Sequence, residues 1–181
     1  IEELKNNNKN IRFFFNKKNK GQSFSINKAI GESRNEIIIT IDGDGQNNPR
    51  DIPILLDYYL LNVNVALVGG IRRNRKDTFI KVVSSKIANK VRSIILDDDC
   101  EDTGCSLKVF SKSIFLSFPY FNGIHRFLPA LFKGYGHECF YIDVDHRARE
   151  EGVSKYGTID RLFKGIIDIL KVRKILKKRS I

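Results

Sequence analysis

The sequence predicts an α/β fold with a mostly parallel central sheet and helices on both of its faces. Apolar β-branched runs alternate with segments of helical apolar spacing along most of the 181 residues, and this alternation is typical of successive βα units. The run EIIITID (36–42) is apolar almost throughout, as expected of a strand buried on both faces, and it stops at DGDGQNNP. Hydrophobic residues make up 41% of the chain, which is enough to build the core of one domain.

The individual elements follow from the local pattern. A short β-rich run at 11–16 precedes a helix-like stretch at 23–33 and the buried strand at 36–42. Asp51 can cap a helix that has Pro53 in its first turn and that runs to about Leu61. Further along the chain we expect a strand at 62–70, a basic helix at 78–96, an acidic loop at 97–105, a strand at 106–110, helices at 111–117 and 124–133, a strand at 138–146 and a terminal helix from about residue 158.

The charge of the chain is concentrated in two helical segments. The formal net charge is +11, which indicates an anionic partner such as nucleic acid, acidic lipid or a phosphorylated substrate. Segments 72–92 and 161–181 each contain eight basic residues and only one acid. A nucleic-acid-binding module would instead interleave basic side chains with exposed aromatics, so we expect no nucleic-acid partner, although such a module remains the alternative from another class.

Cysteine usage and hydropathy exclude several classes. The three cysteines are an odd number without a CxxC pair, which argues against a disulfide framework and a zinc site and favours a reducing compartment. No apolar run approaches the ~20 residues of a membrane-spanning helix.

The segment after the strand at 36–42 is a candidate metal site. Asp42, Asp44 and Gln46 alternate along an extended stretch, so their oxygens can converge on a hard cation such as Mg²⁺ or Mn²⁺. A parallel sheet would place them at the crevice where ligands bind. The alternative is an ordinary polar turn, since Asp-Gly pairs are common at strand ends.

Two further segments carry candidate binding residues. The loop VDHRAREEGVSKYG (144–157) gathers basic and hydroxyl side chains suited to gripping phosphate, or it is a solvated basic loop. The acidic loop at 97–102 could bind a second cation, or it is a flexible charged loop.

The order of these motifs resembles bacterial members of glycosyltransferase family 2 that are similar to dolichol-phosphate mannosyltransferase. The motifs are DGDGQNNP, then GIRRNR (70–75), EDTGCSLKVF (101–110), HRFLPAL (125–131) and the HxxRxxGxSKYG segment (146–157). The segment KNKGQSFSINKAI (18–30) is similar to the stretch that precedes the family's metal motif. The resemblance covers nearly the whole chain and implies a GT-A nucleotide-sugar fold.

The resemblance also implies a reaction and a set of site residues. The reaction is an inverting, metal-dependent transfer of a sugar from a GDP- or UDP-linked donor to a polyprenyl phosphate; a saccharide hydroxyl in cell-envelope polysaccharide synthesis is the alternative acceptor. A hydroxyl acceptor would need a general base, for which Asp102 is the candidate. The implied residues are Asp42, Asp44 and Gln46 for the cation, Arg72, Lys81 and Ser85 for the acceptor phosphate, Arg149, Ser154, Lys155 and Tyr156 for the donor diphosphate, and Asp102, Arg149 and Lys155 for catalysis.

Two parts of the chain follow from the same resemblance. We expect 1–157 to be a catalytic domain that lacks the family's first strand and nucleobase segment. Residues 158–181 form a basic amphipathic helix that lies on an anionic membrane at the cytoplasmic face, because apolar residues and a cationic flank share that segment. The alternative is a helix packed on its own domain with a solvated basic face.

Overall fold

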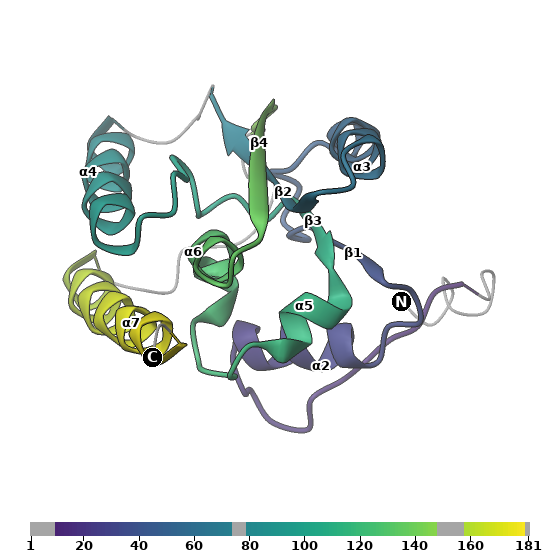
Figure 1. Ribbon diagram of the computed structural model, residues 1–181, viewed down its shortest axis with the longest axis horizontal. Helices are drawn as coiled ribbons and strands as arrows, with labels where there is room; N and C mark the ends of the chain where they lie inside the picture. The colour runs from purple at the N-terminus through teal and green to yellow at the C-terminus, as the bar shows by residue number, and fades with distance from the viewer. Residues whose placement is uncertain (1–9, 74–78, 148–157, 180–181) are drawn as a thin grey trace.

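The structure of the protein is a computed structural model that describes residues 10–73, 79–147 and 158–179, with side chains given except at 79–86, 158–164 and 179. Its centre is a four-stranded sheet, and helices lie on both sides of it (Figure 1). The expected α/β class is therefore confirmed.

The sheet has the strand order β1-β3-β2-β4. Its strands are β1 (Ile37–Thr40), β2 (Val65–Arg72), β3 (Lys108–Ser111) and β4 (Glu138–Val144). Strand β2 is parallel to β4, whereas β3 is antiparallel to both β1 and β2, so β1, β2 and β4 share one direction. The sheet is thus mixed. Strand β3 is reversed because the chain after helix α4 (Phe79–Leu96) runs back through 97–107 to the edge where β2 ends and enters β3 from there.

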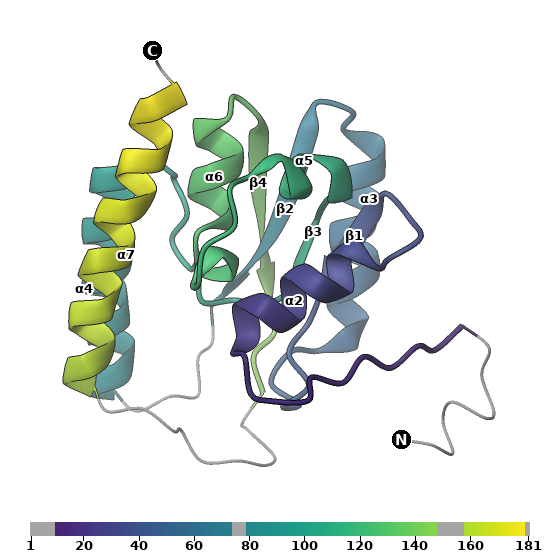
Figure 2. The ribbon, with the colours of Figure 1, turned by 90° about the horizontal axis from the view of Figure 1, so that it is seen from below.

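Helices cover the two faces of the sheet unequally (Figure 2). Helix α3 (Ile52–Leu61) packs on one face, where Leu55 meets Val68 and Val109. The opposite face carries α2 (Gln22–Gly31), α5 (Lys112–Ser117) and α6 (Leu128–Gly134) in a cluster rich in phenylalanine. Alternate residues along β1, β3 and β4 supply the two clusters, as the period-two geometry of a strand requires, whereas in β2 the consecutive Ala66 and Leu67 join the same cluster at an irregularity in the pairing with β4.

Helices α4 and α7 (Thr158–Arg179) lie side by side at one end of the molecule (Figures 1 and 2). Helix α7 also contacts α6, and its Val172 is fully buried. An ion pair of 2.6 Å joins Asp168 of α7 to Arg126. One face of α7 therefore covers the core of the domain.

Two local expectations need correction. Residues 11–16 form no strand. No β-strand in the described part of the chain pairs with them, and Phe15 is 73% exposed. The helix expected at 124–133 is divided into the 3₁₀ turn η2 (Ile124–Arg126) and α6, which begins beside Pro129. Proline is tolerated in the first turn of a helix but lacks the N–H needed further inside, which explains the break.

Candidate functional site

Polar residues from four segments meet at the edge of the sheet where β1, β2 and β4 end. They follow β1 and β4, close β2 at Arg72, and lead into the reversed β3 from Asp102. In α/β sheets ligands bind in the crevice beyond the carboxyl ends of parallel strands. This edge is the candidate site.

The predicted metal-binding residues lie directly beyond β1 and are half-buried. Asp42 Oδ1 accepts a hydrogen bond of 3.2 Å from Gln22 Nε2 at the start of α2. Asp44 Oδ1 accepts one of 3.2 Å from the backbone N–H of Gln46, and Gly45 supplies the positive φ of 75° that the turn needs. Each aspartate thus accepts a hydrogen bond from a neutral donor, which orients its carboxylate at the end of β1.

Ser106 fastens this segment to the chain entering β3. Its hydroxyl donates to Asn47 Oδ1 at 2.6 Å and accepts from the backbone N–H of Asp42 at 3.1 Å. The backbone carbonyl of Ser106 accepts from Thr40 Oγ1 at 2.7 Å. The aspartate segment is therefore held by hydrogen bonds to its own backbone as well as to its side chains.

Asn48 joins the same segment to the end of β4. Its Oδ1 accepts from Arg147 Nη2 at 2.8 Å and from the N–H of Arg50, and its Nδ2 donates to Asp145 at 3.2 Å. Asn48 is thus the cap of the turn before α3, whereas the expected cap, Asp51, instead accepts from the backbone N–H of Asp145 at 2.9 Å. Sequence reasoning missed Asn48 and Arg147, although both lie beside motifs that it had identified.

Arg72 and Asp102 form a bidentate pair. Arg72 Nε and Nη2 donate to the two carboxylate oxygens of Asp102 at 2.7 and 2.8 Å, and both side chains are almost buried. Gly104 leaves room for the pair, because a Cβ there would lie 2.8 Å from Arg72 Nη2. The acceptor-phosphate residue and the candidate base are therefore in direct contact, and Asp102 would act as a base only after Arg72 moves.

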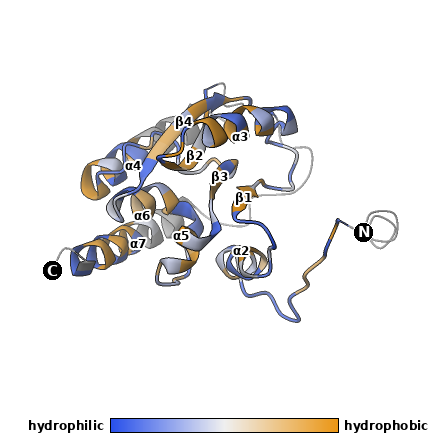
Figure 3. Ribbon diagram, turned by 45° about the vertical axis from the view of Figure 1, so that its right-hand side comes forward, coloured by the Kyte–Doolittle hydropathy of each residue, from blue (hydrophilic) through white to orange (hydrophobic). Residues whose placement is uncertain are grey.

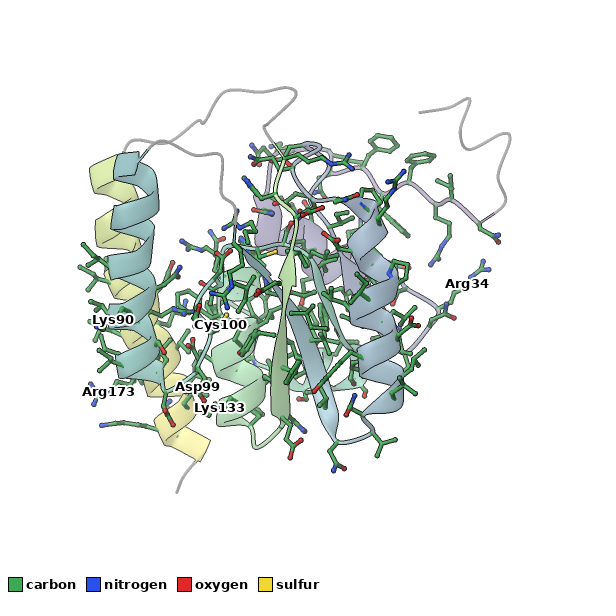
Figure 4. The ribbon with its side chains drawn as sticks, turned by 90° about the horizontal axis from the view of Figure 1, so that it is seen from above. Arg34, Lys90, Asp99, Cys100, Lys133 and Arg173 are labelled. Carbon is green, nitrogen blue, oxygen red and sulfur yellow. The ribbon has the colours of Figure 1, made fainter. Side chains whose placement is uncertain are left out.

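The other acids of the 97–102 loop also have basic partners. Asp98 is fully buried against Arg92 at 3.0 Å, and burial raises the pKa of its carboxyl although Arg92 opposes the rise. Asp97 and Asp99 pair with Lys133, the latter visible in Figure 4, and Glu101 pairs with Arg73 at 2.9 Å. Among the described residues no group of acids in this loop could hold a second cation, and the loop is a charged one whose acids have basic partners.

Several predicted residues cannot be placed. Lys81 and Ser85 belong to α4, but their side chains lie outside the described residues, as do Arg149, Ser154, Lys155 and Tyr156 altogether. His146, at the start of that segment, is described: it is buried and forms a β-bridge with Asn47. The segment predicted to bind phosphate, 144–157, therefore starts beside the aspartate segment.

The donor chemistry fits a divalent metal. Among the described residues no group of three or more His, Cys, Asp and Glu side chains could hold an ion. Asp42 and Asp44 offer two carboxylates and Gln46 an amide oxygen, the hard donors that Mg²⁺ prefers, and such ions commonly complete their shell with water and substrate phosphates. The residues thus fit an ion that is shared with a diphosphate.

A cavity of about 800 Å³ adjoins Asp42. It lies between α2 and β1, and its lining includes Gln22, Ile39, Asp42, Ser106 and Lys108. Burial raises the pKa of all three cysteine thiols, to about 11 for Cys100 and about 12 for Cys139, which favours their protonated form.

The chain is similar to curated enzymes of lipid-linked sugar transfer. It is 37% identical to the dodecaprenyl-phosphate galacturonate synthase of Rhizobium johnstonii over 166 residues, which is 90% of this chain and 48% of the relative. It is 30% identical to the undecaprenyl-phosphate 4-deoxy-4-formamido-L-arabinose transferase of Pectobacterium carotovorum, over 84% of this chain and 46% of the relative. The chain thus spans about half the length of these relatives.

The fold is that of a solved glycosyltransferase. Glucosyl-3-phosphoglycerate synthase from Mycobacterium tuberculosis, in complex with Mn²⁺, UDP-glucose and phosphoglyceric acid, superimposes with a TM-score of 0.64 at 14% identity, over 85% of this chain and 55% of that one. The GT-A fold expected from the resemblance is confirmed. Residues 1–117 match the family described as glycosyl transferase family 2. With that match and these relatives, the chain belongs to glycosyl transferase family 2.

Proposed function

We propose that this chain is the greater part of the catalytic domain of an inverting, metal-dependent glycosyltransferase that moves a sugar from a nucleotide donor to a polyprenyl phosphate. The observation that carries the proposal is the pair of aspartates, Asp42 and Asp44, beyond β1 beside a cavity. The acceptor is inferred from the relatives, whose names specify dodecaprenyl and undecaprenyl phosphate. Membership of the family supplies the reaction class.

The aspartate segment would hold the donor's leaving group. A divalent cation there stabilises the negative charge that develops on the departing nucleoside diphosphate. Asp42, Asp44 and Gln46 supply its protein oxygens, and Gln22 and Ser106 orient Asp42 from two sides. The basic loop would complete the grip on the diphosphate through Arg149, Ser154, Lys155 and Tyr156. UDP and GDP are both candidate carriers.

The acceptor phosphate would bind on the side of Arg72, together with Lys81 and Ser85. A phosphate is already anionic near neutral pH, so its oxygen needs no strong base to attack the sugar. The contact between Asp102 and Arg72 suits this chemistry, because Asp102 can orient the guanidinium without accepting a proton. If the acceptor is instead a saccharide hydroxyl, Asp102 would have to separate from Arg72 and act as the base.

The assay that tests this proposal uses the full-length protein, a panel of UDP- and GDP-sugars, undecaprenyl phosphate and Mn²⁺. We expect one sugar to be transferred to the lipid phosphate, identified by mass spectrometry of the lipid product, with loss of product when EDTA is added. A product formed only on saccharide acceptors would support the alternative. Transfer that is equally fast in EDTA would refute the metal site.

We also propose that α4 and α7 contact an anionic membrane at the cytoplasmic face, with 158–181 as the main contact and 1–157 as the catalytic part. Within the described residues, no helix combines the length and the apolar character needed to cross a bilayer. Polar and apolar residues instead alternate around α7 (Figure 3). The outward apolar side chains are Ile87, Val91 and Ile94 of α4 and Ile166, Ile167 and Leu170 of α7, each between 47% and 74% exposed.

Basic side chains surround these apolar positions. Lys90 of α4 and Arg173 of α7 extend on the same outer side of the helix pair (Figure 4), and Arg173, Lys174, Lys177 and Lys178 line a shallow groove with Leu170. Each basic residue near an anionic leaflet contributes ~1 kcal/mol to binding. Apolar side chains with a cationic border are typical of helices that lie in the headgroup region.

Liposome flotation tests the membrane contact. Deleting 171–181 would remove the buried Val172, so charge reversal is the cleaner change. We expect the double variant Lys174→Glu and Lys177→Glu to lose binding to vesicles containing anionic lipid, and salt to weaken binding of the unaltered protein. The double variant Lys17→Glu and Lys18→Glu carries the same charge change on a distant exposed segment and should still bind. Equal loss in both variants would reduce the effect to net charge.

A further inference from the structure

Lys108 is a lysine buried inside the protein beside the candidate site. It is the first residue of β3 and only 3% exposed. The alternation of side chains along β3 places it on the same face of the sheet as Phe110, and it lines the cavity that adjoins Asp42. A buried ammonium is costly unless hydrogen bonds or opposite charges compensate it, so its contacts indicate its role.

The ammonium of Lys108 donates to two backbone carbonyls of the segment that leads into β3. They belong to Cys105 and, at 3.4 Å, to Thr103. Within the described part of the chain no carboxylate forms an ion pair with Lys108. Burial lowers its pKa, while the nearby negative charge of Asp102 acts in the opposite direction. Lys108 therefore stabilises a backbone turn through its carbonyl oxygens and does not neutralise a single acid.

The turn at 102–106 connects the side of the site that contains Arg72 to the side that contains Asp42. Asp102, at one end of it, holds Arg72, and Ser106, at the other end, holds Asp42 and Asn47. The backbone N–H of Cys105 donates to the carbonyl of Asp102 at 3.3 Å, so the turn is closed on itself around the ammonium. Between these ends, Gly104 packs so closely on Arg72 that a Cβ would collide with it.

We propose that Lys108 is a positioning residue, which holds the turn from Asp102 to Ser106 in the shape that brings Arg72 and Asp42 to their places at one edge of the sheet. This inference rests on the proposed function for its kinetic consequence only. Its structural content, the dependence of the turn on the ammonium, stands apart from that function.

Variants of the full-length protein test the proposal. Lys108→Met removes the charge and both hydrogen bonds at similar volume, and Lys108→Gln keeps an N–H₂ donor without the charge. The matched control is Lys112→Met: Lys112 also donates to a backbone carbonyl, that of Ser33 at 2.7 Å, but it follows β3 at the opposite edge of the sheet. We expect the turnover number per folded molecule to fall about 10- to 100-fold in Lys108→Met, less in Lys108→Gln, and not in Lys112→Met.

Hydrogen exchange supplies a readout that needs no activity. In Lys108→Met we expect faster exchange at the amides of Cys105 and Gly70, whose bonds anchor the turn, and unchanged exchange in the rest of β2. Wild-type turnover in folded Lys108→Met, or exchange that rises equally in all strands, would overturn the proposal. If that variant does not fold, the same two measurements on Lys108→Gln decide. A wild-type protein that transfers no sugar would refute the proposed function, and the exchange pattern would still decide the role of Lys108.

Discussion

The two acidic segments of this protein, 42–46 and 97–102, differ in the donors that contact their carboxylates. Asp42 and Asp44 accept hydrogen bonds from an amide side chain and a backbone N–H. In the second segment Asp97, Asp98, Asp99, Glu101 and Asp102 each pair with lysine or arginine. Neutral donors orient a carboxylate without cancelling its charge, whereas a cationic partner does both. The ion pairs give the second segment a structural role, whereas the first, with Asp42 lining a cavity, has the ligand-binding role that we propose.

The largest effect should come from removing a carboxylate of the first segment. We expect Asp44→Asn to lower turnover at least about a hundredfold and to abolish the Mn²⁺-dependent part of donor binding, because a neutral amide binds a hard cation poorly. Calorimetric titration with nucleotide sugar, with and without Mn²⁺, measures the second effect.

The control for that change is Asp97→Asn in the second segment. Asp97 has a φ of 49°, a conformation that asparagine also tolerates, and its side chain is 89% exposed. Its removal should leave turnover and donor affinity unaltered. Metal-dependent donor binding that survives in Asp44→Asn, or disappears equally in both variants, would break the comparison.

The second effect concerns stability. We expect Asp98→Asn to lower the free energy of unfolding by about 3–5 kcal/mol, because Arg92 would stay buried without its counter-charge. The matched change Asp99→Asn affects a carboxylate that is 72% exposed and should cost less than about 1 kcal/mol. Urea denaturation of both variants measures the difference. Equal losses of stability would mean that the buried ion pair of Asp98 contributes no more than the exposed ion pair of Asp99.

The comparison also marks what could be read from the sequence. The strand that ends before Asp42 was predictable, because a continuous β-branched run followed by DGDG indicates both the strand and its end. The placement of Asp42 and Asp44 at the edge of the sheet followed from this. The roles within DDDCED were not predictable from local pattern, since three consecutive aspartates read as a solvated loop. The burial of Asp98 depends on Arg92 from α4, a contact that only the tertiary fold creates.

Contacts between segments distant in the sequence explain the other differences between expectation and structure. The reversed direction of β3 could not be predicted from periodicity, because it depends on how residues 97–107 return along the sheet. The described apolar residues of α7 divide between two sides of the helix: Val172 is buried, while Ile167 and Leu170 are exposed. The roles of Arg149, Ser154, Lys155 and Tyr156 stay predictions.

The smallest effect is a pH dependence on the side of the first segment. Helix α2, which carries Gln22 to Asp42, is tethered through Ser23, whose hydroxyl accepts from the N–H of Gly123 at 2.7 Å and lies 2.8 Å from His125 Nδ1. The hydroxyl of Ser23 can donate its proton to Nδ1 when that nitrogen carries no hydrogen, as in one neutral tautomer of His125. Burial, helped by the positive charges of Arg126 and Lys108, lowers the pKa of His125 to about 4.

A depressed histidine pKa stabilises the folded protein above the unfolded-state pKa of about 6.5, and this contribution is lost as the pH falls toward 4. In that window the unfolded chain binds more protons, so the free energy of unfolding should fall with decreasing pH by up to about 1.4 kcal/mol per unit from this group. His125→Gln can still accept from Ser23 and does not titrate. The difference in stability between the unaltered protein and this variant, measured by urea denaturation, should shift in favour of the variant as the pH falls from 7 to 4. A difference that stays constant over that range would show that His125 is not kept neutral by the fold, and that α2 does not depend on it to hold Gln22 against Asp42.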